Sequence, residues 1–318
     1  MESLFEYRNC PNCGQDDFEV LFESNMEPDD FNVLFDYSME GHNTQEGEEG
    51  YLVPGKQWGR HVKCRNCHLV YMNPIEKISK TNEYYHSAKN THAPTIRDSY
   101  LRTAKSQVNL VKKHASGSNL LDIGCAQGFF LFSAAQAGYR VKGIEISQDA
   151  AEYAKTEFGL DVEAKAFEEL EFPGNHFDVV TLWQVLEHVP YPLDVLREVR
   201  KMLKPGGLLA VSTPNIAGLP SRLLRKKWWD IKRLHINEFS TRTLMDILRN
   251  AEFKNVSPAS YKGFISLSIL LTMMLKYVNG YQRWKFLFNE GSLSGKILNK
   301  IMLIYPSKFN HCVVLGFK

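Results

Sequence analysis

From residue 116 onward, short apolar runs of strand length alternate with segments whose apolar residues recur at helical spacing. Helix-like segments lie between most of these runs, and one of them begins after the predicted N-cap Ser147. Consecutive parallel strands need such crossovers, so the order predicts an α/β fold with a parallel sheet and helices on both faces. The runs that read as strands are "NLLDIG" (119–124), "YRVKGIEI" (139–146), "DVEAKAF" (161–167), "HFDVVTLWQV" (176–185) and "LLAVSTPN" (208–215).

Two further strands are predicted at 254–262 and 311–318. The segment between them is rich in Leu, Ile, Met, Phe and Tyr. It suits a lid, a dimer surface or an interfacial helix pair, with core packing as the simplest interpretation. Before the α/β region, Leu101, Val108 and Val111 recur at helix-like spacing and indicate a bridging helix. The expected parts are a first section at 1–74, bridging helices at 75–115 and an α/β domain at 116–318 with insertions at 216–240 and 263–310.

Four of the six cysteines form two C-x-x-C pairs, Cys10 with Cys13 and Cys64 with Cys67. Four thiolates suit a tetrahedral Zn²⁺ ion, which would be structural because no coordination position stays open for water. The pairs are farther apart than the about 15–20 residues of common zinc ribbons, so an acidic insert would loop out between them. We therefore predict a zinc-ribbon-like module over residues 1–74. The alternative is four free thiols in a packed module.

A glycine turn follows the first predicted strand, in "LLDIGCAQG". Ligands of open α/β sheets bind beyond the carboxyl ends of the strands, and Gly124 and Gly128 remove side chains where a ligand would approach the backbone. The spacing differs from the dinucleotide fingerprint G-x-G-x-x-G, and a packing turn is the alternative. Glu145, at the end of the second strand, can accept hydrogen bonds from both ribose hydroxyls of a nucleoside ligand.

Several segments together, "LLDIGCAQGFFL", "GIEIS", "FDVVTLWQVLEHVPYPLDVLREVRKMLKPGGLLAVSTPN" and "HINEFS", resemble class I S-adenosylmethionine-dependent methyltransferases. The resemblance implies a seven-stranded, doubly wound sheet with an antiparallel last strand. It places the two glycines against the methionine part of S-adenosyl-L-methionine, Ala166 and Phe167 beside the adenine, and Gln184 near the sulfonium. The cofactor-binding residues it implies are Asp122, Gly124, Cys125, Gly128, Glu145, Ala166, Phe167 and Gln184.

The second cysteine pair and its sequel, "CHLVYMNP", resemble the N-terminal extension of bacterial methyltransferases that are associated with sugar, polysaccharide or secondary-metabolite pathways. This likeness agrees with the zinc-ribbon-like module expected from the cysteine spacing. It points toward a biosynthetic role for the chain.

Two histidines are candidate general bases, because an imidazole titrates near neutral pH. His188 follows the fourth strand, and His235 follows the insertion after the fifth strand. The alternative for each is a structural histidine that bonds a loop, and Glu187 is a candidate to orient a histidine or to ligate a metal. The insertion "PSRLLRKKWWDIKRLH" could bind an anionic acceptor through its basic side chains and stack against it through its tryptophans. The alternative is that the basic side chains are only solvated and the tryptophans are part of the core. The candidate substrate residues of the insertion are Arg222, Arg225, Lys226, Lys227 and Trp228.

These observations predict methyl transfer to a small-molecule or lipid-linked acceptor, most simply at a hydroxyl. The alternatives are C-methylation of a nucleotide sugar, a non-catalytic scaffold and an RNA-modifying enzyme. Nucleic acid is not expected, because the net charge is only +2 and residues 11–55 contain no Lys or Arg. The N-terminus lacks a signal-peptide pattern, and the apolar run at 264–275 is shorter than the about 20 residues of a membrane span. We expect a cytoplasmic protein, with peripheral membrane contact through 264–288 as an alternative.

Overall fold

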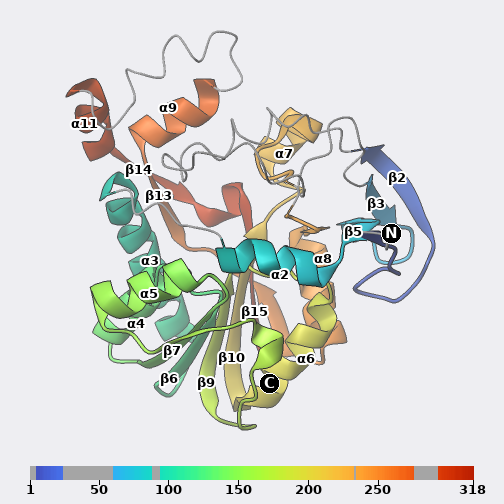
Figure 1. The fold of residues 1–318 in the computed structure, drawn as a ribbon, viewed down its shortest axis with the longest axis horizontal. Coiled ribbons are helices and arrows are strands. Elements are labelled where there is room, and N and C mark those ends of the chain that lie inside the picture. The colour runs from blue at the N-terminus through green and yellow to red at the C-terminus, as the bar shows by residue number, and fades with distance from the viewer. Residues whose placement is uncertain (1–4, 24–59, 88–93, 233, 276–292) are drawn as a thin grey trace.

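A seven-stranded mixed sheet forms the centre of the molecule (Figure 1). The computed structural model describes residues 5–23, 60–87, 94–232, 234–275 and 293–318. Only β15 runs against the other strands of this sheet, pairing antiparallel with β10 and β12. The predicted α/β fold with an antiparallel last strand is therefore confirmed. In spatial order the strands are β12 (Lys254–Pro258), β15 (His311–Phe317), β10 (Leu203–Pro214), β9 (Phe177–Trp183), β6 (Asn119–Ile123), β7 (Arg140–Glu145) and β8 (Val162–Ala164).

Helices cover both faces of this sheet (Figure 1). Side chains alternate across a strand, so Leu208 of β10 packs on one side and Leu209 packs on the other. Because helices cover both sides, the side chains on both sides of the central strands are mainly apolar, and each of these strands is a nearly continuous apolar run in the sequence. The helices on the side of Leu208 are α3 (Pro94–His114), α4 (Phe129–Gln136) and α5 (Gln148–Phe158), and those on the side of Leu209 are α6 (Pro192–Met202) and α8 (Thr241–Asn250).

Local sequence sets the start of α5 but not the end of α6. Ser147 caps α5 as predicted, since its hydroxyl accepts the N–H of Ala150. Pro205 and Gly206 are residue types that commonly follow the end of a helix. The α6 helix nevertheless ends earlier, at Met202, and β10 begins at the next residue. The proline and glycine instead lie in β10, where its register against β9 shifts.

The N-terminal section forms a second, four-stranded sheet in the order β11, β4, β3 and β2. Its edge strand comes from a distant part of the chain, because Asn237 and Glu238 pair with Tyr71 and Val70. Tyr71 also belongs to the buried cluster on that side of the large sheet to which Leu209 points. The strands are β2 (Phe18–Glu23), β3 (Arg60–Cys64), β4 (Val70–Met72) and β11 (Asn237–Glu238), and β1 (Phe5–Glu6) pairs separately with β5 (Ile75–Glu76).

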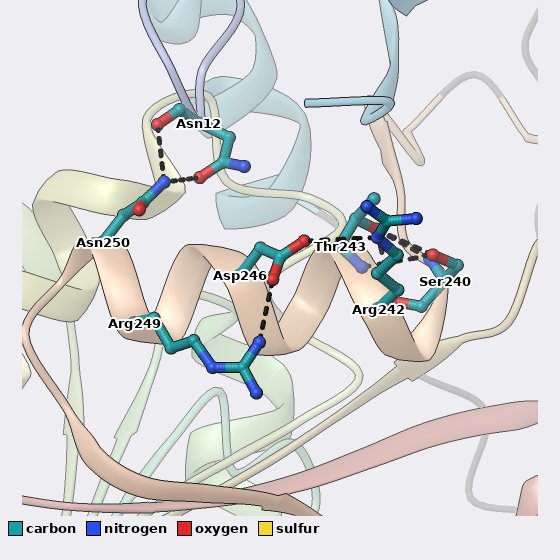
Figure 2. A network of polar contacts seen from close by, with 7 residues as sticks. All are labelled: Asn12, Ser240, Arg242, Thr243, Asp246, Arg249 and Asn250. Carbon is teal, nitrogen blue, oxygen red and sulfur yellow. Dashed lines mark hydrogen bonds and ion pairs between the residues drawn. The ribbon is translucent and has the colours of Figure 1, made fainter. Parts of the chain in front are cut away.

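Polar contacts of Arg8 and Asn12 join this N-terminal section to the α/β domain. The guanidinium of Arg8 is buried and donates hydrogen bonds to the carbonyls of Pro190 and Ile236, the latter at 2.8 Å. Figure 2 shows the second contact, in which Asn250 at the end of α8 donates to the side-chain oxygen of Asn12 at 2.8 Å. The two parts therefore share polar contacts, a sheet and a core.

The segment expected as an insertion at 263–310 contains a two-stranded sheet of β13 (Lys262–Ser266) and β14 (Met302–Pro306). It lies along α3, since the N–H of Phe264 donates to the hydroxyl of Thr103 at 3.0 Å. No described helix is long and apolar enough to cross a bilayer. Residues 276–292, which hold much of the stretch considered for membrane contact, lie outside the described residues. Within the described residues, the remaining α-helices are α2 (Ile78–Ser87), α7 (Leu219–Leu224), α9 (Leu267–Leu275) and α11 (Leu293–Lys300).

Candidate active site

A cavity of about 740 Å³ opens at the carboxyl ends of β6, β7 and β9. This is the edge at which open α/β sheets bind their ligands. The cavity is lined by the glycine turn, the end of β7 and the segment after β8. It is also lined by aromatic residues from α2, α3, β9, β13 and β14, and we call this part of the lining the aromatic end.

The glycine turn is fixed by main-chain bonds and by its conformation. The N–H groups of Gly124 and Cys125 both donate to the carbonyl of Ile144, at 2.8 and 3.0 Å. Gly124 has φ +69°, and a Cβ there would lie 2.5 Å from Val185. A side chain at Gly124 is thus excluded by backbone strain and by a neighbour.

Gly128, which the family resemblance places against the cofactor, lies at the start of α4. It also has a positive φ of +79°, but it does not line the cavity. A Cβ at this position would lie 2.7 Å from Leu160 and 2.9 Å from the Cβ of Ala154. Gly128 therefore allows α4 to begin close to α5.

Glu145 lines the cavity at the end of β7 and is only 9% exposed. Its two oxygens accept the N–H groups of Ala126 and Ser147, each at 2.8 Å. Burial raises its pKa, although these main-chain donors oppose the rise. The carboxylate thus holds the glycine turn in shape and keeps acceptor capacity toward the cavity.

Asp122 is buried beside the turn and also lines the cavity. The Thr181 hydroxyl donates to its Oδ1 at 2.6 Å, and burial raises the pKa of Asp122 to about 8. Gln184 lines the cavity at the end of β9, with its side-chain amide donating to the Ser212 hydroxyl at 2.8 Å. Of the eight cofactor-binding residues expected, all except Gly128 line this cavity: Asp122, Gly124, Cys125, Glu145, Ala166, Phe167 and Gln184.

The aromatic end of the cavity was not anticipated from the sequence. Trp183 meets Tyr261 edge to face, with ring centroids 5.8 Å apart, and it meets Phe130 in the same manner at 5.3 Å. These residues are separated by tens of positions along the chain, so no local spacing could have grouped them. The aromatic residues that line this end are Tyr85, Tyr100, Trp183, Tyr261, Phe264 and Tyr305.

His188 lines the cavity, and His235 lies behind it with an exposed fraction of 5%. Their rings meet edge to face with centroids 4.7 Å apart. His188 Nδ1 is 2.9 Å from the carbonyl of Leu234 and 2.8 Å from the hydroxyl of Tyr85. Burial lowers the pKa of His188 to about 4 and the pKa of His235 well below its usual value, so both imidazoles are neutral at neutral pH.

Comparison with known proteins places this geometry in a family. A family model described as a methyltransferase domain matches residues 94–258, which is more than half of the 318 residues. The chain belongs to the methyltransferase-domain family. This result agrees with the cavity at the strand ends and with the glycine turn that lines it.

Curated relatives of this methyltransferase domain carry a more specific name. The ubiquinone biosynthesis O-methyltransferase of Burkholderia vietnamiensis is 42% identical over 110 residues, which cover 32% of this chain and 47% of the relative. The enzyme of the same name from Pseudomonas entomophila is 40% identical over 119 residues, covering 34% and 50%. The chain thus spans about half the length of the curated relatives it matches.

A solved structure supports the methyltransferase fold. Phosphoethanolamine N-methyltransferase 2 of Haemonchus contortus aligns with a TM-score of 0.51 at 15% identity, covering 78% of this chain and 62% of that one. At this identity the likeness shows the fold alone. It agrees with the order of the seven strands found here.

The basic insertion of the methyltransferase domain does not reach the cavity. Arg222, Arg225, Lys226 and Lys227 are exposed, and none of them lines it. Trp228 is only 1% exposed, and its indole N–H donates to Asn310 at 3.3 Å. Charge pattern alone could not tell an outward-facing basic turn from a binding surface, whereas burial of Trp228 removes it as a stacking surface for a ligand.

The two cysteine pairs of the N-terminal section come together. Cys10 Sγ is 3.4 Å from Cys67 Sγ, and Cys13 Sγ is 3.5 Å from Cys64 Sγ. All four sulfurs lie within 4.8 Å of one another. Sulfurs at about 2.3 Å from one tetrahedral ion are about 3.8 Å apart, so the cluster is compatible with a zinc module.

Proposed function

We propose that the protein transfers a methyl group from S-adenosyl-L-methionine to a hydroxyl of a small-molecule acceptor. The position of Glu145 carries the proposal. Its carboxylate is held at the cofactor end of the cavity by two main-chain donors, where it can bind ribose hydroxyls. The names of the curated relatives favour oxygen as the methylated atom. We further propose that the four clustered thiols bind one structural Zn²⁺ ion.

The acceptor would occupy the aromatic end of the cavity. Trp183, Tyr261 and Tyr305 provide ring surfaces suited to an uncharged ring system that carries the hydroxyl. The exposed basic residues of the insertion lie outside the cavity lining, so the geometry favours this acceptor over the anionic or lipid-linked one suggested by sequence. In the transfer, the acceptor oxygen attacks the methyl carbon in line, the carbon–sulfur bond breaks, and the sulfonium becomes a neutral thioether.

The acceptor hydroxyl must also lose its proton. We assign this step to the region of His188 and His235, because His188 faces the cavity and His235 packs against it. This keeps both histidines that the sequence singled out, with His188 rather than His235 next to the acceptor.

Replacing Glu145 by alanine should weaken binding of S-adenosyl-L-methionine by about 1.5–3 kcal/mol, the scale of hydrogen bonds to a charged group. Isothermal titration calorimetry measures this directly. The matched control is Glu163→Ala, which removes a carboxylate on the neighbouring strand β8 that pairs with Lys142 and lies outside the cavity lining. Equal affinity in both variants would refute the cofactor site.

Incubating the protein with cell extract and S-adenosyl-L-methionine that carries a deuterated methyl group tests the reaction. We expect mass spectrometry to find a product that carries the labelled methyl group on oxygen. A labelled carbon or nitrogen atom would contradict O-methylation while leaving the cofactor site intact.

A further inference from the structure

Three side chains with metal-ligand chemistry converge beside the aromatic end of the cavity. Glu187, His188 and His235 each offer a ligand atom, and these atoms lie within 4.8 Å of one another. The main chain brings them together, because the N–H groups of Ile236 and Asn237 donate to the carbonyl of Glu187 at 2.9 and 3.1 Å. The segment after β9 is thereby tied to the segment that precedes β11, and His235 is carried next to Glu187.

Glu187 lacks the partners that a buried carboxylate normally has. Its side chain is 1% exposed, and neither oxygen accepts a hydrogen bond from any other residue in the described part of the chain. His235 is 5% exposed, and its Nδ1 likewise has no described partner. Unpaired buried polar atoms are costly, and a buried carboxylate more so. A bound cation would satisfy the carboxylate oxygens and this ring nitrogen together.

His188 is oriented as metal-binding histidines commonly are. A carbonyl oxygen can only accept, so the contact with Leu234 at 2.9 Å places the ring proton on Nδ1. The lone pair of the neutral ring then lies on Nε2. A backbone carbonyl that fixes one nitrogen in this way is the usual support of a histidine whose other nitrogen binds a metal.

We propose that Glu187, His188 and His235 bind one divalent metal ion of the borderline type, such as Zn²⁺, Co²⁺ or Fe²⁺, at the acceptor end of the cavity. Two imidazoles and a carboxylate suit these ions. Bonds of about 2.1 Å to one ion would require these ligand atoms to move closer together than the 4.8 Å limit within which they lie here. Three protein ligands leave a position for water or an acceptor oxygen, whose proton the metal would make easier to remove.

The catalytic role of this ion rests on the proposed methyl transfer, in which His188 and His235 would act through the bound ion. Metal binding itself does not depend on the reaction. The competing arrangement is that Lys232 balances Glu187 without a metal. The Lys232 ammonium acts electrostatically on all three residues and lies 3.5 Å from Asp230.

Cobalt binding separates the two arrangements. The full-length protein would be treated with a mild chelator and loaded with Co²⁺, then examined by elemental analysis and visible absorption. We expect one Co²⁺ per chain with the absorption of nitrogen and oxygen ligands and without a sulfur-to-cobalt charge-transfer band, in addition to the metal of the thiol cluster. If Co²⁺ binds only with that sulfur band, or does not bind, the proposal is overturned.

Matched variants locate the ion. Glu187→Gln and His235→Gln should each raise the dissociation constant of Co²⁺ about tenfold or more. His311→Gln should leave it unchanged, because His311 also lines the cavity and has an unpartnered Nδ1 but stands outside the three-residue cluster. Unchanged affinity in Glu187→Gln would refute the site, and if the variants do not fold, the wild-type spectrum decides. Calorimetry with S-adenosyl-L-methionine, run on the same wild-type protein, reports separately on the proposed methyl transfer.

Discussion

Cys64→Ser is expected to remove the proposed Zn²⁺ ion and to lower the free energy of unfolding by more than about 4 kcal/mol, a loss on the scale of a missing structural metal. Cys64 is fully buried and belongs to the same packed cluster as residues of the large sheet. The loss should therefore spread beyond the N-terminal section. Elemental analysis and urea unfolding measure the two effects.

The control for this experiment is Cys312→Ser, a buried cysteine on β15 that lies outside the thiol cluster. Its Sγ already lies 3.6 Å from the carbonyl of Phe239, so a serine hydroxyl there has an acceptor nearby. We expect the zinc content to stay the same and the stability to change little. If the two variants behave alike, the cysteine pairs do not hold a metal.

Gly128→Ala is expected to destabilise the protein by about 2–5 kcal/mol. The left-handed backbone at φ +79° costs about 1–2 kcal/mol with a Cβ. The methyl group would also collide with Leu160 and Ala154, which adds the about 1–3 kcal/mol of an overpacked core. Chemical denaturation of the two proteins gives the difference.

Gly159→Ala separates these two contributions. Gly159 ends α5 at φ +66°, and a Cβ there meets nothing within 4 Å. This variant should therefore show the backbone cost alone, about 1–2 kcal/mol. Equal losses in both variants would mean that the contact between α4 and α5 adjusts without cost.

The parts of the fold that sequence could predict are those set by local patterns. The alternation of strand-like and helix-like segments predicted the central sheet, and Ser147 was predicted as the N-cap of α5. The glycine turn and Glu145 were expected together because each follows a strand, and parallel strands end at the same edge. Their proximity is confirmed by the bond between Glu145 and Ala126.

Other features depend on contacts between distant segments and leave no local pattern. A strand as short as Asn237–Glu238 has no periodicity of its own, so its pairing with β4 could not be expected. The same holds for the aromatic end of the cavity, which combines residues from several elements. The packing of Gly128 against Leu160 and Ala154 likewise depends on how α4 and α5 meet, which the sequence around Gly128 does not encode.

The sheet shared by the N-terminal section and β11 bears on how this protein can be divided. The match to the family model begins at residue 94, which suggests a convenient starting point for a shortened protein. Cutting there would strip Asn237 and Glu238 of their strand partners and leave the carbonyls of Pro190 and Ile236 without Arg8. Pro190 and Ile236 lie within two residues of His188 and His235 in the sequence. We therefore expect a protein that begins at residue 94 to lose part of the support around these two histidines, and the cysteine-bearing section belongs with the methyltransferase domain in any functional test.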